Sequence, residues 1–172
     1  GYLTTNSKKI YDQIQDLKNH GMTKRNLIKC FGYVSRMDNL QAAILNYRLK
    51  SLNKVLLTRR KNAYLYNKYI DKKNVFIPQE SKYEFNTYHT FVIQVEKRDE
   101  LKDYLLKQGI ETAIHYPTPI HLQPAANELA YKLGDFPVTE KQAEMILTLP
   151  VNQSLGQSEI KRICVIVNEF YS

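Results

Sequence analysis

The stretch from Thr90 to His115, TFVIQVEKRDELKDYLLKQGIETAIH, changes its hydrophobic period twice. Residues 90–95 are rich in β-branched and aromatic side chains, which favour a strand. Residues 98–108 carry leucines and a tyrosine at helical spacing, and Gly109 is suited to end that helix. Residues 110–115 are again largely apolar and β-branched. The stretch therefore predicts a strand, a helix and a second strand.

The sequence beyond this stretch predicts further helices and one more short strand. Pro124 suits the first turn of a helix. Residues 139–142, TEKQ, fit a capping box for a helix that ends near Leu147. A short strand at 149–151 and a final helix at 158–171 complete the pattern. A few strands covered by helices make an α/β (α+β) two-layer sandwich, the fold class that we expect.

On the N-terminal side, the pattern predicts one long helix. Ser35 and Asp38 have the spacing of a capping box, and residues 22–34 before them show no clear period and are expected to be a loop. Apolar stripes at helical spacing follow with no Gly or Pro before Pro78, so the helix is expected to run from about residue 36 to about residue 70. Such a length suggests a connector between domains.

Composition favours a globular, cytoplasmic protein and offers little support for other classes. The chain has 172 residues, of which 43% are hydrophobic, and its longest apolar runs are too short to cross a bilayer. The two cysteines, Cys30 and Cys164, are isolated and fit neither a disulfide framework nor a zinc site. The net charge of +8 raises the possibility of nucleic-acid binding. The basic residues are scattered, however, so a solvated surface is the favoured interpretation and no nucleic-acid partner is expected.

Two of the four histidines lie beside a pair of prolines. His115 and His121 are six residues apart, a spacing that suits neither one helical face nor a common zinc pair, so no metal is expected. Pro117 and Pro119 restrict the backbone at low entropic cost, so His115, Tyr116 and His121 could line the mouth of a pocket that binds an anion. The same residues could equally cap the edge of a core. The residues alone leave these two interpretations level.

Four motifs occur together in a pattern that is similar to one known family. They are NHGM at 19–22, GYVSRMDNLQAAIL at 32–45, IETAIHYPTPIHLQPA at 110–125 and FPVTEKQAEMILTLPVNQSL at 136–155. In this order and at these distances they resemble the DegT/DnrJ/EryC1/StrS family of pyridoxal-phosphate-dependent sugar aminotransferases. The resemblance covers nearly the whole chain.

The resemblance implies that the chain is the C-terminal part of such an enzyme. Residues 1–31 would be the trailing edge of the large cofactor-binding domain, and residues 32–172 the small C-terminal domain with its linking helix. The Schiff-base lysine would precede residue 1, so no catalytic residue is expected within the chain. The intact enzyme would be a homodimer that transfers an amino group from glutamate to a nucleotide-linked keto-sugar for amino-sugar or cell-surface polysaccharide synthesis. A sugar dehydratase of the same family and a non-catalytic binding module stay open as alternatives.

The resemblance also implies roles for particular residues. Ser35 and Arg36 match a loop that helps to bind the cofactor phosphate, or the substrate, in the partner subunit's site. Val34 stands where many relatives have an asparagine that contacts phosphate, and valine cannot donate that hydrogen bond. His115 and Tyr116 match residues that line the nucleotide-sugar pocket, and the second histidine of that motif is His121.

We predict that the 172-residue chain alone does not bind pyridoxal phosphate, because the resemblance places the lysine and most of the phosphate-binding residues outside it. Absorption spectroscopy of the purified chain with added cofactor is the measurement. An absorbance band typical of an internal aldimine would contradict the prediction.

Overall fold

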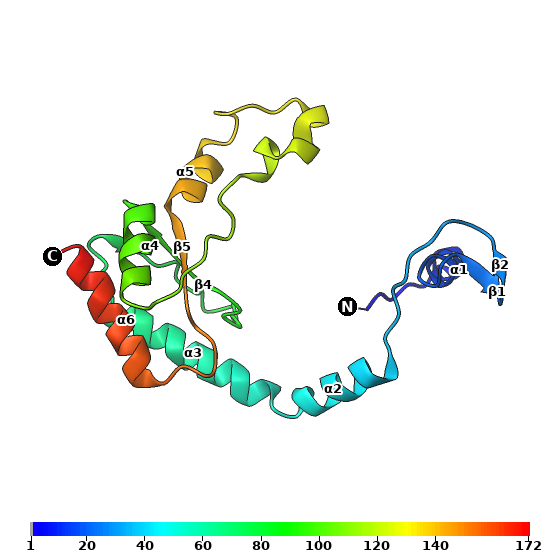
Figure 1. Ribbon diagram of the computed structural model, residues 1–172, viewed down its shortest axis with the longest axis horizontal. Helices are drawn as coiled ribbons and strands as arrows, with labels where there is room; N and C mark the ends of the chain where they lie inside the picture. Colours follow the sequence, from blue (N-terminus) through cyan, green and yellow to red (C-terminus); the bar gives the residue numbers. More distant parts are fainter. Residues whose placement is uncertain (1) are drawn as a thin grey trace. The chain divides into compact units, whose positions relative to one another are not determined.

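The structure is a computed structural model that describes residues 2–172, so Gly1, included in the expected domain 1–31, lies outside it. The chain forms two compact units that divide after Ser51 (Figure 1). The division does not coincide with the boundary expected after residue 31. Among residues 2–172, no helix is both long and apolar enough to cross a bilayer.

The helix expected at about 36–70 is two helices, α2 (Asn39–Leu49) and α3 (Leu52–Tyr69). The regular hydrogen-bond ladder stops where the amide of Ser51 donates to the carbonyl of Arg48, only three residues back. The chain leaves the α-helical ladder here for a tighter, three-residue hydrogen bond, so the expectation of one continuous helix was wrong. The division between the two units falls at this interruption.

The first unit contains α1 (Lys8–Leu17), a hairpin of β1 (Met22–Lys24) and β2 (Leu27–Ile28), and α2. The hairpin lies where the sequence predicted a loop, because two short strands leave too few residues to show a period. The capping box also differs from the prediction. The N-cap of α2 is Asp38, whose amide donates a hydrogen bond to Gln41 Oε1 at 3.3 Å, so Ser35 lies outside the box.

The first unit has almost no interior of its own. Within residues 2–51, Gly21 alone is buried. Many large apolar side chains of this unit are exposed: Tyr2, Leu3, Ile10, Tyr11, Leu17, Leu27, Ile28, Phe31, Tyr33, Val34, Met37, Leu40, Ile44, Leu45, Tyr47 and Leu49. A soluble protein rarely leaves so many large apolar side chains exposed without an interaction surface among them.

The second unit is built on a three-stranded antiparallel sheet. Its strands are β3 (Val75–Phe76), β4 (Phe91–Val95) and β5 (Ile146–Leu149), in the order β3-β4-β5. Alternate residues of β4 are buried, as expected for a strand with one face against a core. The sequence predicted β4 correctly and missed β3, whose two residues are too short a signal.

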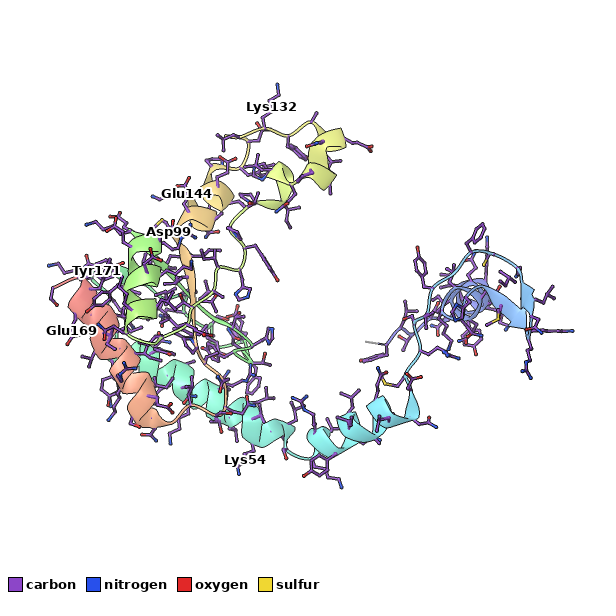
Figure 2. All side chains as sticks on the ribbon, in the orientation of Figure 1. Lys54, Asp99, Lys132, Glu144, Glu169 and Tyr171 are labelled. Carbon is purple, nitrogen blue, oxygen red and sulfur yellow. The ribbon has the colours of Figure 1, made fainter. Side chains whose placement is uncertain are left out.

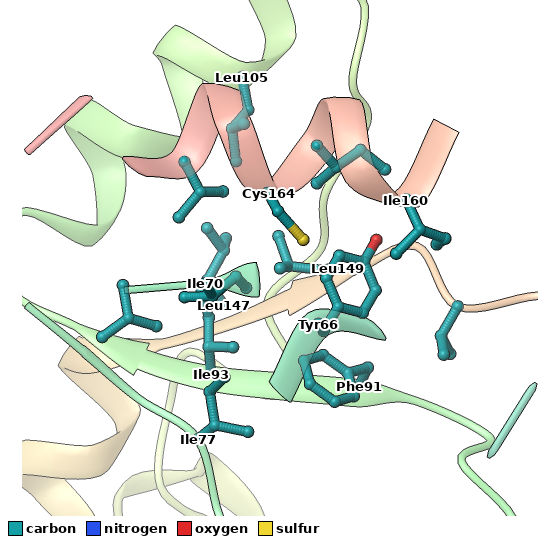
Figure 3. Close-up of a cluster of buried hydrophobic side chains, with 14 of the residues drawn as sticks. Tyr66, Ile70, Ile77, Phe91, Ile93, Leu105, Leu147, Leu149, Ile160 and Cys164 are labelled. Carbon is teal, nitrogen blue, oxygen red and sulfur yellow. The ribbon is translucent and has the colours of Figure 1, made fainter. Parts of the chain in front are cut away.

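Three helices supply the rest of the core: α3, α4 (Arg98–Lys107) and α6 (Gln157–Phe170). Figure 3 shows side chains of these helices meeting those of the sheet. The fully buried side chains include Tyr66, Ile93, Leu101, Leu105, Leu147, Leu149, Ile160 and Val167. Helices packed on a small sheet confirm the expected α/β (α+β) two-layer class. The predictions of α4 and α6 are also confirmed within one residue at either end.

Three elements between α4 and α6 differ from the prediction. The short strand expected at 149–151 is β5, which begins three residues earlier and ends at Leu149. Residues 110–115 form no strand, and only Ala113 pairs with the sheet, through an isolated bridge to Thr148. The helix expected after Thr139 is α5 (Pro137–Met145), which begins three residues earlier, with Pro137 in its first turn. Proline is well suited to that position because its missing N–H would have no helical partner there. Two 3₁₀ turns, η1 (Ile120–Leu122) and η2 (Pro124–Leu129), precede it.

An ion pair attaches the connection between β3 and β4 to α3. Arg60 donates to both carboxylate oxygens of Glu80, at 2.8 and 2.9 Å, and also to the carbonyl of Asn86 at 2.7 Å. Its guanidinium lies 4.3 Å from the ring centre of Phe85. The hydrogen bonds from Arg60, together with one from the Asn86 amide, hold the pKa of the Glu80 carboxyl below its ordinary value.

We expect replacement of Glu80 by Gln to destabilise the protein near neutral pH but not in acid. Because the pKa of Glu80 is lowered by folding, its stabilisation is present above its unfolded-state pKa and is lost as pH falls through the folded-state value. Urea unfolding at about pH 7 and about pH 3 measures this, with exposed Glu128→Gln as the control. A midpoint difference that persists undiminished at the lower pH would refute the assignment.

Candidate functional site

The loop at 32–36 is fixed to the end of α1 by its backbone. The amide of Tyr33 donates to the carbonyl of Leu17 at 2.7 Å, and the amide of Ser35 donates to the carbonyl of Lys18 at 2.9 Å. Backbone hydrogen bonds of this kind set the path of the loop independently of its side chains. The loop can therefore present the two side chains at its end from a defined position.

Two glycines allow this close approach. A Cβ on Gly32 would lie 2.4 Å from the amide nitrogen of Gly21 and 2.8 Å from the carbonyl oxygen of Leu17. Gly21 has a φ of +72°, and a Cβ there would lie 1.7 Å from the carbonyl oxygen of Cys30. A side chain at Gly32 would push the loop away from the end of α1, and one at Gly21 would displace the backbone at Cys30.

Ser35 and Arg36 line an open hollow of about 670 Å³ in the first unit, together with Asn19 and Lys18. Among residues 2–172, no carboxylate pairs with Arg36. Asn19 Oδ1 is buried and has no hydrogen-bond partner within the described residues. The Asp16 carboxylate also lines the hollow and is paired with Lys29 at 2.9 Å. The remaining hydroxyl, guanidinium, ammonium and amide groups make a donor set that fits a phosphate group.

The sequence did not single out Asn19 as a site residue, although it begins the NHGM motif. Its relation to Arg36 depends on the hairpin and on the return of the loop to α1, which are contacts between distant residues. Val34, where relatives were expected to have asparagine, is 65% exposed and offers no donor. Asn19 supplies an amide within the same region, from a different element.

The second candidate region begins where the chain leaves the sheet edge. Ala113 and Thr148 exchange two backbone hydrogen bonds, of 3.2 and 2.7 Å. His115 Nδ1 then lies 2.9 Å from Thr148 Oγ1, and the ring of Tyr116 meets that of His115 edge to face at 5.5 Å between centres. Tyr116 is 74% exposed, so its hydroxyl is free to meet a ligand.

His121 is placed differently from His115. Its side chain is only 8% exposed, and its Nε2 lies 2.9 Å from Glu140 Oε1. The ring of Phe136 covers it at 4.8 Å between centres. The structure therefore brings His115 and Tyr116 to the surface, and it places His121 beneath the surface against a carboxylate.

Glu140, at the start of α5, receives hydrogen bonds from several parts of the chain. Its carboxylate accepts from the amide of Gly134 at 2.9 Å and from that of Phe136 at 3.2 Å. Partial burial acts to raise the pKa of Glu140, but these amides and His121 outweigh it and lower the pKa. The carboxylate therefore stays ionised where the free N–H groups of a helix N-terminus favour a negative charge. The sequence pattern indicated only that Glu140 belongs to a capping box that begins at Thr139.

Metal chemistry finds no support in the described part of the chain. Within residues 2–172, no group of three or more His, Cys, Asp or Glu side chains is placed to hold an ion. The arrangement instead offers hydrogen-bond donors in two places, the loop at 32–36 and the segment that follows the sheet edge.

Comparison with known proteins decides the family. A family profile described as "DegT/DnrJ/EryC1/StrS aminotransferase family" matches residues 1–168. The chain belongs to this family. The resemblance drawn from the four motifs is therefore confirmed. A relative from Geobacillus stearothermophilus, named "Pleiotropic regulatory protein", is 33% identical over 99% of this chain and 47% of its own length.

Other relatives of this chain are named as transaminases. The "dTDP-3-amino-3,6-dideoxy-alpha-D-galactopyranose transaminase" of Aneurinibacillus thermoaerophilus is 33% identical over 99% of this chain and 46% of its own length. The solved structure of DesV from S. venezuelae "in complex with ketimine intermediate" superposes with a TM-score of 0.84 at 30% identity, covering 96% of this chain and 45% of that one. The chain thus spans about half the length of the relatives that it matches.

We predict that Gly32→Ala loosens the loop at 32–36. The added methyl group would meet backbone atoms of Gly21 and Leu17 that cannot rotate away, at a cost of about 1–3 kcal/mol. The exchange of the amides of Tyr33 and Ser35 should therefore become roughly tenfold faster or more, as measured by hydrogen exchange.

Gly156→Ala is the control for this substitution. The nearest atom to its Cβ would be a side-chain oxygen of Glu159 at 3.5 Å, an ordinary contact. Unaltered exchange of the two amides in Gly32→Ala would show that the close approach does not fix the loop.

Proposed function

We propose that this chain is the C-terminal part of a pyridoxal-phosphate-dependent aminotransferase, which moves an amino group from glutamate to a nucleotide-linked keto-sugar. The observation that carries the proposal is the family match over residues 1–168, joined by relatives named as transaminases of nucleotide-linked sugars. These relatives are about twice as long as this chain. The intact enzyme is proposed to be a cytoplasmic homodimer.

The domain assignment belongs to the same proposal. Residues 1–31 would end the large cofactor-binding domain, and residues 32–172 would form the small domain together with the helices α2 and α3. The exposed apolar side chains of the first unit support this assignment, because the rest of a large domain would cover them.

Ser35 and Arg36, with Asn19, are proposed to bind the cofactor phosphate in the partner subunit's site. The Arg36 guanidinium can form two parallel hydrogen bonds to phosphate oxygens, and the Ser35 hydroxyl can donate a third. Pyridoxal phosphate, when bound, supplies the aldehyde that takes up the amino group and the ring that accepts electrons. The Schiff-base lysine is proposed to lie in the part of the enzyme that precedes residue 1.

His115, Tyr116 and His121 are proposed to serve the nucleotide-sugar pocket. Tyr116 and the remaining ring nitrogen of His115 can form hydrogen bonds with sugar hydroxyls or the diphosphate. Thr148 fixes the orientation of the His115 ring through Nδ1, so the imidazole meets a ligand without a large loss of side-chain entropy. His121, which lies beneath the surface, would support this pocket from below.

Expression of the complete reading frame that encodes this chain tests the proposal. Incubation with glutamate, pyridoxal phosphate and a panel of nucleotide-linked keto-sugars should yield 2-oxoglutarate and an amino sugar in equal amounts. Sugar consumption without any glutamate consumption would favour the dehydratase alternative. Cofactor-free protein that binds the nucleotide sugar without turnover would indicate a binding module.

Within that enzyme, Arg36→Ala should weaken cofactor affinity by roughly tenfold to a hundredfold, because a charge-assisted hydrogen bond contributes about 1.5–3 kcal/mol. Titration of the cofactor-free enzyme with pyridoxal phosphate measures this. Arg48→Ala, which removes another exposed arginine from the first unit, is the control. Equal cofactor affinities of the two variants would exclude Arg36 from the phosphate site.

A further inference from the structure

The segment Tyr116–Ile120 is anchored at both ends to one continuous piece of chain. At its start, His115 contacts Thr148 of β5, and at its end, His121 contacts Glu140 of α5. α5 and β5 follow one another directly in the sequence. The five residues between the two histidines, called the span below, are therefore attached at both ends to the same piece of structure.

The anchor at Glu140 connects parts of the chain that are far apart in sequence. Both of its carboxylate oxygens lie 2.9 Å from the amide of Gly134, and Oε1 also accepts from Phe136. The contact with His121 Nε2 at 2.9 Å crosses 19 residues. Figure 2 shows the chain around Lys132 projecting from the rest of the unit and returning to it through α5, which carries Glu144.

We propose that Glu140, acting through His121, is a positioning residue for nucleotide-sugar binding. The Glu140–His121 contact holds the C-terminal end of the span so that Tyr116 is presented to the substrate. Neither Glu140 nor His121 touches the substrate itself, since their side chains are 13% and 8% exposed. This inference rests on the proposed function. It holds that the Glu140–His121 pair, beneath the surface, keeps the exposed Tyr116 ordered for substrate binding.

A purely local role for Glu140 would have different consequences. A carboxylate that only caps α5 needs the amides of Gly134 and Phe136 and has no use for His121. The two roles can be separated, because His121→Ala removes the link to the span and leaves both amides with their acceptor. Glu140→Ala removes the link and the cap together.

Substitutions at position 140 can likewise separate the effect of side-chain length from the effect of negative charge. Glu140→Asp keeps the negative charge but is shorter by one methylene group, so it cannot contact Gly134 and His121 together. Glu140→Gln keeps the length and one carbonyl acceptor, and its amide can still donate to a neutral imidazole. A positioning role predicts that Gln restores function better than Asp, and a role of the charge alone predicts the reverse.

The test uses the complete enzyme and two readouts. In His121→Ala, we expect the KM for the nucleotide sugar to rise about tenfold, with kcat and the KM for glutamate changed less than about twofold, because uniform binding is lost and not transition-state stabilisation. Hydrogen exchange of residues 116–123 should accelerate while β4 and α6 remain unchanged. Glu140→Ala should show both effects together with faster exchange at Gly134 and Phe136.

Glu144→Ala, an exposed glutamate of the same helix, is the matched control and should leave all of these quantities unaltered. Unchanged exchange of the span in His121→Ala, or faster exchange with an unchanged KM, would overturn the positioning role. Failure of the unaltered enzyme to transfer amino groups would instead overturn the proposed function, and the exchange measurement does not depend on that activity.

Discussion

The backbone pairing of Thr148 with Ala113 is the constraint on which the second candidate region depends. Thr148 lies in β5, where it also pairs with Val92 of the central strand, and only 8% of it is exposed. Its side-chain hydroxyl contacts His115. One residue thus joins the buried sheet, the departing backbone and the first candidate ligand. The position of His115 follows from the packing of the core and not from the preferences of a loop, which is how a rigid scaffold supports an exposed binding residue.

The two histidines acquire distinct roles from this arrangement. Pro117 and Pro119 restrict the backbone angles of the span, but they do not determine where its ends lie. His115 and His121 do so, by contacts with a hydroxyl and a carboxylate on adjoining elements. Restricting both the ends and the interior lowers the conformational entropy that would otherwise be lost when a ligand binds. Tyr116, which makes no such anchoring contact among residues 2–172, is left exposed for recognition.

The parts of this structure that the sequence predicted are those whose signals are local. The strand and helix within 90–109 follow from short-range periodicity and a glycine at φ +74°. Residues 110–115 have strand-like composition, but a strand needs a partner along its whole length, and here the sheet offers one bridge. The role of Glu140 was missed for a related reason. Its capping partners are near in sequence, whereas His121 reaches it only through the fold, so a local pattern shows the helix start and not the anchor.

The two candidate regions are stabilised by different physical means. The span is attached to a sheet with a packed core, while the loop at 32–36 is attached by backbone hydrogen bonds to a helix that has no buried side chain. Ordering each residue costs about 1–2 kcal/mol of backbone entropy, and a unit in which only Gly21 is buried within residues 2–51 cannot offset that cost by its own apolar contacts. The close approach of Gly32 to Gly21 fixes the local path of the loop but contributes no core. The order of Ser35 and Arg36 therefore depends on backbone contacts with the end of α1, whereas the order of the span depends on a packed core within residues 52–172.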